Sequence, residues 1–104
     1  MITKKGEVIA IENVSLSKSD SESISKKINL LMASTLAEVR RRGSLSSELK
    51  INANQINNLG KYLVSKKKGD FQIIARALDD SQSAEKVSVS LELQSLVKSI
   101  SNKS

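Results

Sequence analysis

The sequence feature that most constrains the fold is an apolar stripe within residues 22–42. Its members recur at spacings of three and four residues, which places them on one face of a helix. They are Ile24, Ile28, Leu31, Met32, Thr35, Leu36 and Val39. Ser21 or Ser23 can cap the start of this helix. Three arginines at 40–42 favour its negative C-terminal end, and Gly43 can take the left-handed conformation that ends it. The sequence therefore predicts a long amphipathic helix over 22–42.

Three shorter helices are expected between this helix and residue 80. Ser44 is a suitable N-cap for a helix over 45–50. Asn52, followed three residues later by Gln55, resembles a capping box at the start of a helix over 53–65. Asp70 can cap a helix over 71–78, whose one apolar face would carry Phe71, Ile74, Ala75 and Leu78. The expected fold class is all-α, a small domain of four to five helices.

The two ends of the chain are expected to differ from this middle part. Residues 1–21 are predicted to form a flexible N-terminal arm that holds a short strand over 7–11 and a serine-rich connector. The last segment, 83–101, allows two interpretations. Apolar residues alternate with polar ones over 87–93, as in a strand, but apolar residues at 89, 93, 96 and 100 also follow a helical spacing. Its length and composition favour a C-terminal helix, which we expect to mediate oligomerisation.

Residues 42–61 carry the spacing of a helix-turn-helix. In this motif two short helices pack at a steep angle, and the second lies in the major groove of DNA. The buried positions that the motif requires are occupied, without a gap, by Leu45, Ser46, Leu49, Ile51, Ile56 and Leu59. The sequence therefore predicts a helix-turn-helix DNA-binding domain over 22–80.

The distribution of charge supports the same interpretation. The chain of 104 residues has a net charge of +6, with ten Lys/Arg against four Asp/Glu between residues 22 and 70. The flanks 1–21 and 71–104 are each balanced, with three against three and four against four. A basic field confined to one segment is typical of proteins that contact phosphates, although a solvated Lys-rich surface gives the same count.

The run from Ser46 to Ile56, with its Gln55-Ile56 pair, resembles phage and bacterial helix-turn-helix regulators. It is most similar to the lysogeny-establishing transcription activators of lambdoid phages, and the similarity extends to the Phe-led segment 71–78. The resemblance implies a transcription regulator that binds double-stranded DNA as a homo-oligomer, a dimer or tetramer, and that has RNA polymerase as a further partner.

The expected recognition helix over 53–65 has an outward face suited to reading bases. Asn pairs bidentately with adenine in the major groove, whereas Lys binds guanine or phosphate. The predicted base-reading residues are Ala53, Asn54, Asn57, Asn58 and Lys61. Phosphate contacts, which position a protein without reading sequence, are predicted for Arg40, Arg41, Arg42, Lys50, Lys66, Lys67 and Lys68.

Other function classes have less support. The chain lacks histidine and cysteine and has no glycine-rich phosphate loop, so we expect no enzyme activity, no metal site, no cofactor and no catalytic residue. It also lacks an apolar run long enough for a membrane span or a signal peptide, so we expect a cytoplasmic or nucleoid-associated protein. The alternative is a helical subunit of a flagellar or type III secretion rod, because residues 86–93 resemble the C-terminal helix of such subunits.

Overall fold

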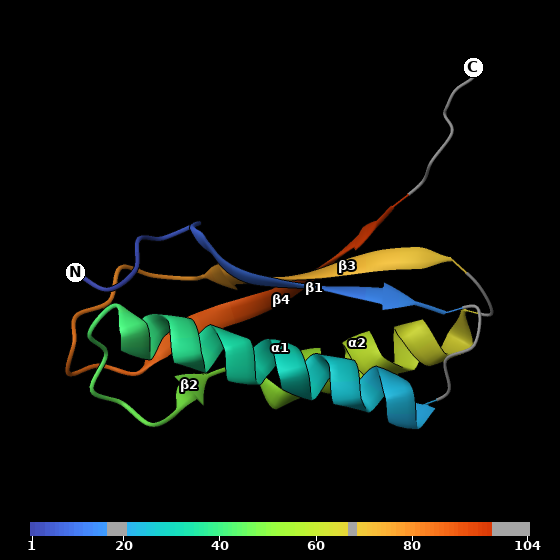
Figure 1. The fold of residues 1–104 in the computed structure, drawn as a ribbon, viewed down its shortest axis with the longest axis horizontal. Coiled ribbons are helices and arrows are strands. Elements are labelled where there is room, and N and C mark those ends of the chain that lie inside the picture. Colours follow the sequence, from blue (N-terminus) through green and yellow to red (C-terminus); the bar gives the residue numbers. More distant parts are fainter. Residues whose placement is uncertain (17–20, 67–68, 97–104) are drawn as a thin grey trace, which may run out of the picture.

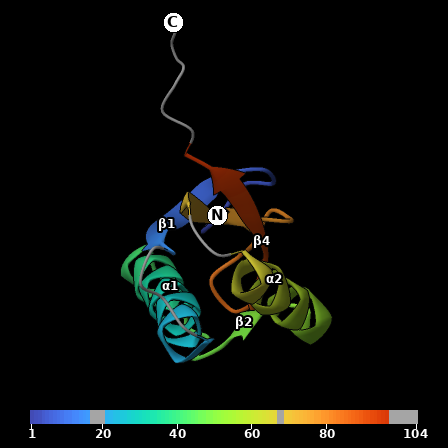
Figure 2. The ribbon, with the colours of Figure 1, turned by 90° about the vertical axis from the view of Figure 1, so that its right-hand side faces the viewer.

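A computed structural model describes residues 1–16, 21–66 and 69–96. Its elements are β1 (Val8–Ser15), α1 (Ser21–Arg41), β2 (Leu49–Lys50), α2 (Ala53–Ser65), β3 (Asp70–Ala77) and β4 (Val87–Ser95). The strands form one sheet in the order β1-β3-β4-β2. Both helices lie antiparallel to each other on one face of this sheet, so the molecule has two layers (Figure 1). The end-on view shows α1 below β1 and α2 below β4 (Figure 2).

The sheet is mixed. β3 pairs antiparallel with both β1 and β4, so that Ile74 lies opposite Ile11 on one side and Glu92 on the other. β2 pairs parallel with β4, but only through Leu49 with Val87 and Lys50 with Ser88. Three strands therefore make up most of the sheet, and β2 covers only the beginning of the outer edge of β4.

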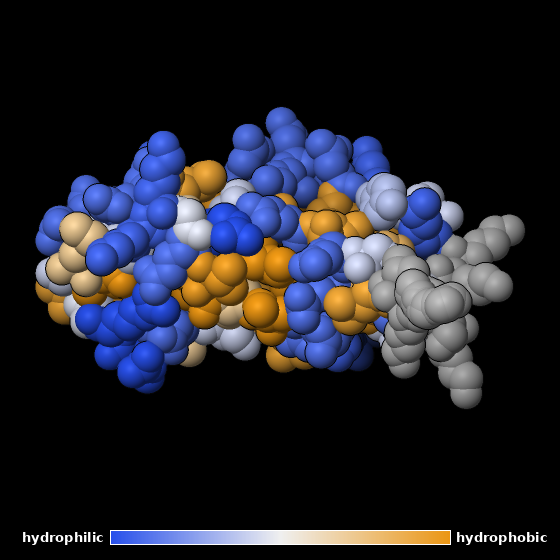
Figure 3. All heavy atoms as spheres, turned by 90° about the horizontal axis from the view of Figure 1, so that it is seen from above, coloured by the Kyte–Doolittle hydropathy of each residue, from blue (hydrophilic) through white to orange (hydrophobic). Residues whose placement is uncertain are grey.

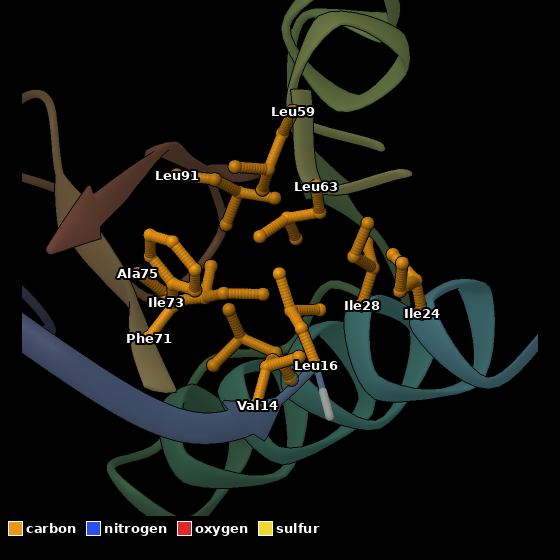
Figure 4. Packing of buried hydrophobic residues seen from close by; sticks show 11 residues of the cluster. Val14, Leu16, Ile24, Ile28, Leu59, Leu63, Phe71, Ile73, Ala75 and Leu91 are labelled. Atoms are coloured by element: carbon orange, nitrogen blue, oxygen red, sulfur yellow. The ribbon is translucent and has the colours of Figure 1, made fainter. Parts of the chain in front are cut away.

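The core lies between the sheet and the two helices in two clusters. Figure 4 shows the larger one, in which side chains from both helices converge on β1, β3 and β4. Its members include Ile28 and Leu31 of α1, Leu63 of α2, and Ile73 of β3. The smaller cluster lies towards the C-terminal end of α1, with members Ile2, Ile9, Val39, Ala77, Val87 and Val89. Aliphatic residues make up nearly all of both clusters, because Phe71 and Tyr62 are the only aromatic residues of the chain.

In the described part of the chain, no helix covers the other face of the sheet. Figure 3 shows this face, where hydrophobic residues form a patch along the middle with hydrophilic residues around it. Ile11 of β1 is 49% exposed, whereas its cross-strand neighbour Ile74 is 8% exposed. The face that α1 and α2 cover is more apolar, since it holds the core of the molecule.

Several predicted elements are confirmed. α1 and α2 lie where the periodicity placed them, and the N-terminal strand is present but longer, over Val8–Ser15. Gly43 has a φ of +109°, and the Ser44 N–H donates to Val39 O at 2.9 Å, which closes the last turn of α1. Asn52 caps α2, because its side chain accepts a hydrogen bond from the Asn54 N–H.

The all-α fold class is wrong, because two of the predicted helices are strands and a third does not form. Residues 70–77 form β3, and residues 87–95 form β4, so the strand interpretation of the last segment is the correct one. Residues 45–50 are a loop that ends in β2, and Leu45, an expected core position, is 79% exposed. The helix-turn-helix arrangement is therefore absent from this fold.

The N-terminal arm also needs correction. Residues 8–15 are a strand of the sheet, and Ile2 and Thr3 are buried. The Ile2 N–H donates to Ser81 O at 2.7 Å, and the Ser81 N–H donates to Thr3 O at 3.0 Å. This ladder fixes the beginning of the chain beside the turn that precedes β4. Part of the predicted serine-rich connector, and the end of the predicted C-terminal helix at 97–101, lie outside the described residues.

Candidate nucleic-acid interface on α2

All five residues predicted to read bases lie on α2 with exposed side chains. They are Ala53, Asn54, Asn57, Asn58 and Lys61. At 3.6 residues per turn, the last four fall within roughly 100° of arc on the helix surface. The opposite face of α2 is anchored by Leu59 and Leu63, which are buried against the sheet and α1. The fold therefore holds this polar face outward on a helix of 13 residues.

The electrostatic character of α2 is positive. Lys61 is the only charged residue within the helix, and Lys50 and Lys66 lie just before and just after it. The Lys66 ammonium lies 4.9 Å from the centroid of the exposed Tyr62 ring, a cation–π arrangement. Within the part of the chain that the structure describes, the side chains of Lys50 and Lys61 have no carboxylate or hydrogen-bond partner. Their charge is therefore available to a ligand.

Two of the three arginines at the end of α1 have carboxylate partners. Arg42 donates to Glu38 at 2.8 Å and to Glu7 at 2.9 Å, and it also donates to Ile2 O at 3.3 Å. Arg41 donates to both carboxylate oxygens of Glu38, at 2.9 and 2.6 Å. Hydrogen bonds first from Arg41 and then from Arg42 lower the pKa of Glu38 from 4.5 to about 2. In turn, Glu38 raises the pKa of both arginines.

The predicted phosphate-binding residues are consequently spread over the molecule. Arg40 is exposed, whereas Arg41 and Arg42 are committed to the ion-pair cluster with Glu38 and Glu7. α1 has 21 residues and spans about 30 Å, with the arginines at its C-terminal end and Lys66 beyond the opposite end of the helix pair (Figure 1). Lys67 and Lys68 lie outside the described residues.

Grooves flank α2 on both sides. The groove towards α1, of about 530 Å³, is lined by the buried Ile24 and Ile28 and by the exposed Asn57, Lys61 and Val64, among others. The groove towards β4, of about 410 Å³, is lined by Gln55, Asn58, Leu59, Tyr62, Leu91 and Leu93. The predicted base-reading residues therefore form the crest between two grooves.

Sequence reasoning missed the second groove. Gln55 was expected to complete a capping box, but its Oε1 accepts a hydrogen bond from the Leu91 N–H of β4 at 3.0 Å. Tyr62 had no predicted role, yet it is 45% exposed and meets Phe71 edge-to-face, with 6.4 Å between the ring centroids. The sequence did hold a signal for this groove, because apolar and polar residues alternate over 87–93 as they do in a strand. Only as a strand does this segment place the Leu91 N–H where Gln55 can accept its hydrogen bond.

The described residues give no support to a metal site or to a membrane-spanning helix. Among residues 1–16, 21–66 and 69–96, no group of three or more acidic side chains is placed to hold a metal ion. Asp80 instead accepts a hydrogen bond from the Lys5 N–H, and Glu85 accepts one from the Gln82 N–H. No helix in the described part of the chain is long and apolar enough to cross a membrane.

In a comparison with protein-family models, residues 3–99 match the family described as the DUF3084-associated C-terminal helical hairpin. The match covers most of the chain, so the chain belongs to this family. The antiparallel pair α1 and α2 fits the description of a helical hairpin, and the matched residues also include the four strands that cover the hairpin. No curated protein and no solved structure matches the chain.

Proposed function

We propose that this member of the DUF3084-associated helical-hairpin family binds double-stranded DNA with the outward face of α2. The observation that carries the proposal is the composition of that face. It presents three asparagines and one lysine, and α2 contains no acidic residue. Within the described residues, the asparagine side chains at positions 54, 57 and 58 make no hydrogen bond to the rest of the fold. Asparagine also lowers the stability of a helix, so its repeated use there favours a role in binding.

The dimensions of α2 are compatible with a major groove. A helix of 13 residues is about 20 Å long, and the major groove of B-DNA, about 12 Å wide, admits one α-helix. Asn54, Asn57 and Asn58 offer amides that can pair bidentately with adenine. Lys61 lies on the same arc and can contact guanine or phosphate. In this proposal the sheet and α1 support a single reading helix, in place of the predicted helix-turn-helix.

Phosphate contacts are assigned to cations on either side of α2. Lys50 and Lys66 lie just beyond its two ends, and both have exposed side chains. Arg40 is a further exposed cation at the end of α1. Arg41 and Arg42 are omitted from this set, because a phosphate would have to compete with Glu38 and Glu7 for their guanidinium groups. These contacts would position the protein without reading sequence.

The experiment selects duplexes from a random pool and then measures Kd for the selected and a scrambled duplex by gel shift at two salt concentrations. Wild type should prefer the selected duplex, and the double variant Asn54→Ala, Asn57→Ala should lose that preference while keeping its weaker binding to both duplexes. Each lost bidentate pair corresponds to about 1–3 kcal/mol of discrimination. The control is Asn13→Ala, which removes an exposed asparagine of β1 and should leave the preference unchanged.

Two outcomes contradict the proposal. The first is a binding constant that is independent of salt, because DNA contacts made through lysine release counterions and weaken as salt rises. The second is an unchanged preference for the selected duplex in the double variant, which would remove α2 as the reading element.

A further inference from the structure

The outer edge of β4 is largely unpaired. β4 has nine residues, and β2 pairs with only the first two of them, Val87 and Ser88. On its other side β4 pairs with β3 continuously from Val89 to Ser95. Within the described residues, no strand hydrogen-bonds to the outer edge of β4 between Val89 and Ser95. Exposed strand edges of this kind present backbone donors and acceptors that another strand can pair with.

One backbone group of this edge is satisfied by a side chain. The Leu91 N–H donates to Gln55 Oε1 at 3.0 Å, so this N–H points away from β3 and towards α2. In a regular strand, backbone groups two residues apart point to the same side. The register with β3 is continuous over this stretch, so the Leu93 N–H also points outward. Gln55 thus occupies one position of a hydrogen-bonding row that continues beyond it.

A groove runs beside this row. Its wall is α2, which contributes Leu59, Tyr62 and the amides of Gln55 and Asn58, and its floor includes Leu91 and Leu93. Leu91 is 5% exposed, and Leu93 is partly buried against the core. Figure 4 shows Leu59 of α2 and Leu91 of β4 pointing towards each other at this place. The groove therefore combines apolar side chains with an unpaired main-chain edge.

We propose that this edge accepts an extended peptide segment of another protein, which adds to the sheet beside β4 in line with β2. Strand addition of this kind takes its affinity from main-chain hydrogen bonds and its specificity from pockets for alternate side chains. Apolar side chains at alternate positions of the peptide would face Leu91, Leu93 and Tyr62 in the groove. An acidic residue at the peptide end beside the C-terminal part of α2 would face Lys66, whose ammonium lies 4.9 Å from the centroid of the Tyr62 ring that lines this groove.

A second copy of this chain fits the edge less well than a single peptide. α2 lies close enough to the edge for Gln55 to reach the Leu91 N–H, so a copy that paired through its own β4 would bring a second α2 to the same place. Each copy has Lys61 on α2 and Lys66 just after it, and α2 holds no acidic residue, so the two helices would repel each other. A lone strand brings neither the bulk nor the positive charge.

The probe is a fluorescein-labelled peptide in which three valines alternate with two threonines between terminal glutamates. Its affinity for the full chain is measured by fluorescence anisotropy. The informative variant is Leu93→Pro, which removes an outward N–H, and its matched control is Leu93→Ala, which removes the side chain but keeps the N–H. Proline is tolerated in edge strands where the N–H does not serve the ladder. We expect Leu93→Pro to bind the peptide roughly tenfold more weakly than Leu93→Ala. Proline removes one hydrogen bond to the peptide, and its ring obstructs the approach of the peptide backbone.

A gain of affinity tests the same edge in the opposite direction. Gln55→Ala removes the side chain that competes for the Leu91 N–H, so it should bind the peptide several-fold more tightly than wild type. Asn57→Ala is the control, because it shortens an exposed amide of α2 that lines the other groove, towards α1. In wild type, hydrogen exchange of the Leu93 amide should slow when the peptide is added, a readout that needs no variant to fold.

Several results would overturn the proposal. They are the absence of peptide binding to wild type, equal affinities for Leu93→Pro and Leu93→Ala when both fold by circular dichroism, and an unprotected Leu93 amide in the presence of peptide. Sedimentation that shows a wild-type dimer which Leu93→Pro breaks and Leu93→Ala keeps would assign the edge to a second copy instead. The double variant Asn54→Ala, Asn57→Ala should bind the peptide as wild type does, so failure of the DNA proposal leaves this one standing.

Discussion

The end of α1 and the outward face of α2 are both rich in positive charge, but their cations have different surroundings. At the end of α1, Arg41 and Arg42 share the carboxylate of Glu38, and Arg42 also reaches Glu7. On and beside α2, Lys50 and Lys61 have no carboxylate partner within the described residues. One region therefore uses its charge within the fold, and the other presents it to solvent.

This difference shows what the charge at each place accomplishes. Arg42 joins three segments that are far apart in sequence, because it contacts Glu38 in α1, Glu7 before β1 and the carbonyl of Ile2. It thereby fixes the first residues of the chain against the end of α1. The lysines around α2 make no comparable link, so their removal should affect binding and leave folding nearly unchanged.

The largest effect on stability is expected for Arg42→Ala. The change breaks hydrogen bonds to two carboxylates and a carbonyl at a side chain that is only 23% exposed. We expect a loss of about 2 kcal/mol in the free energy of unfolding, because hydrogen bonds to charged groups contribute more than neutral ones. Urea denaturation measures it, with Lys61→Ala as the matched control, whose change should stay within about 0.5 kcal/mol.

Arg42→Lys adds a second comparison at the same position. It keeps the positive charge but lacks the planar fork that contacts Glu38 and Glu7 together, so its loss should lie between wild type and Arg42→Ala. Equal stabilities of Arg42→Ala and Lys61→Ala would show that the ion-pair cluster does not hold the fold.

A smaller and pH-dependent effect is expected for Glu38→Gln. The pKa of Glu38 is lowered from 4.5 to about 2 in the folded protein, so its carboxylate stabilises the fold above about pH 4.5 and loses this contribution as the pH falls towards 2. Glutamine does not titrate. The difference in unfolding free energy between wild type and Glu38→Gln should therefore be largest above pH 5 and should shrink towards pH 2.

Thermal unfolding monitored by circular dichroism between pH 2 and 7 measures this difference. Glu22→Gln is the control, since Glu22 forms an exposed pair with Lys26 at 3.7 Å and lacks a paired arginine. A constant difference between wild type and Glu38→Gln across the whole range would contradict the assigned pKa.

The elements predicted correctly from the sequence are those in which the local pattern of apolar residues matches the pattern of buried residues in the fold. α1 and α2 each bury one stripe of a helix, and their ends carry local signals in Gly43 and Asn52. β3 gives no such pattern, because Ile73, Ile74 and Ala75 are all buried in succession. Apolar and polar residues therefore do not alternate along β3 as they do in a half-buried strand. Phe71, Ile74, Ala75 and Leu78 then match a helical spacing by coincidence. The antiparallel neighbours on both sides decide that β3 is a strand, and they lie far away in sequence.

The candidate site was likewise predictable only where it depends on local sequence. The outward face of α2 follows from the helix alone, so its exposed asparagines could be predicted. The contact between Gln55 and Leu91 spans 36 residues and requires β4 to be a strand at the right register. The helix-turn-helix spacing failed for a related reason. Leu49 pairs with Val87 in the sheet, a distant partner that fixes residues 49–50 as β2 and leaves Leu45 exposed.

The smallest effect, and the most direct contrast between the two basic regions, is in the salt dependence of DNA binding. Lys61→Ala and Arg41→Ala each remove one positive charge from an exposed side chain. If α2 contacts DNA as proposed, Lys61→Ala should reduce the slope of log K against log salt by about 0.9, the value for one phosphate contact on duplex DNA. Arg41→Ala should leave the slope unchanged, because its charge is already neutralised by Glu38.

Fluorescence anisotropy with the selected duplex at four or more salt concentrations gives both slopes. Equal reductions would mean that the ion-paired and the unpaired cations contribute alike, and the distinction between the two regions would then not extend to binding.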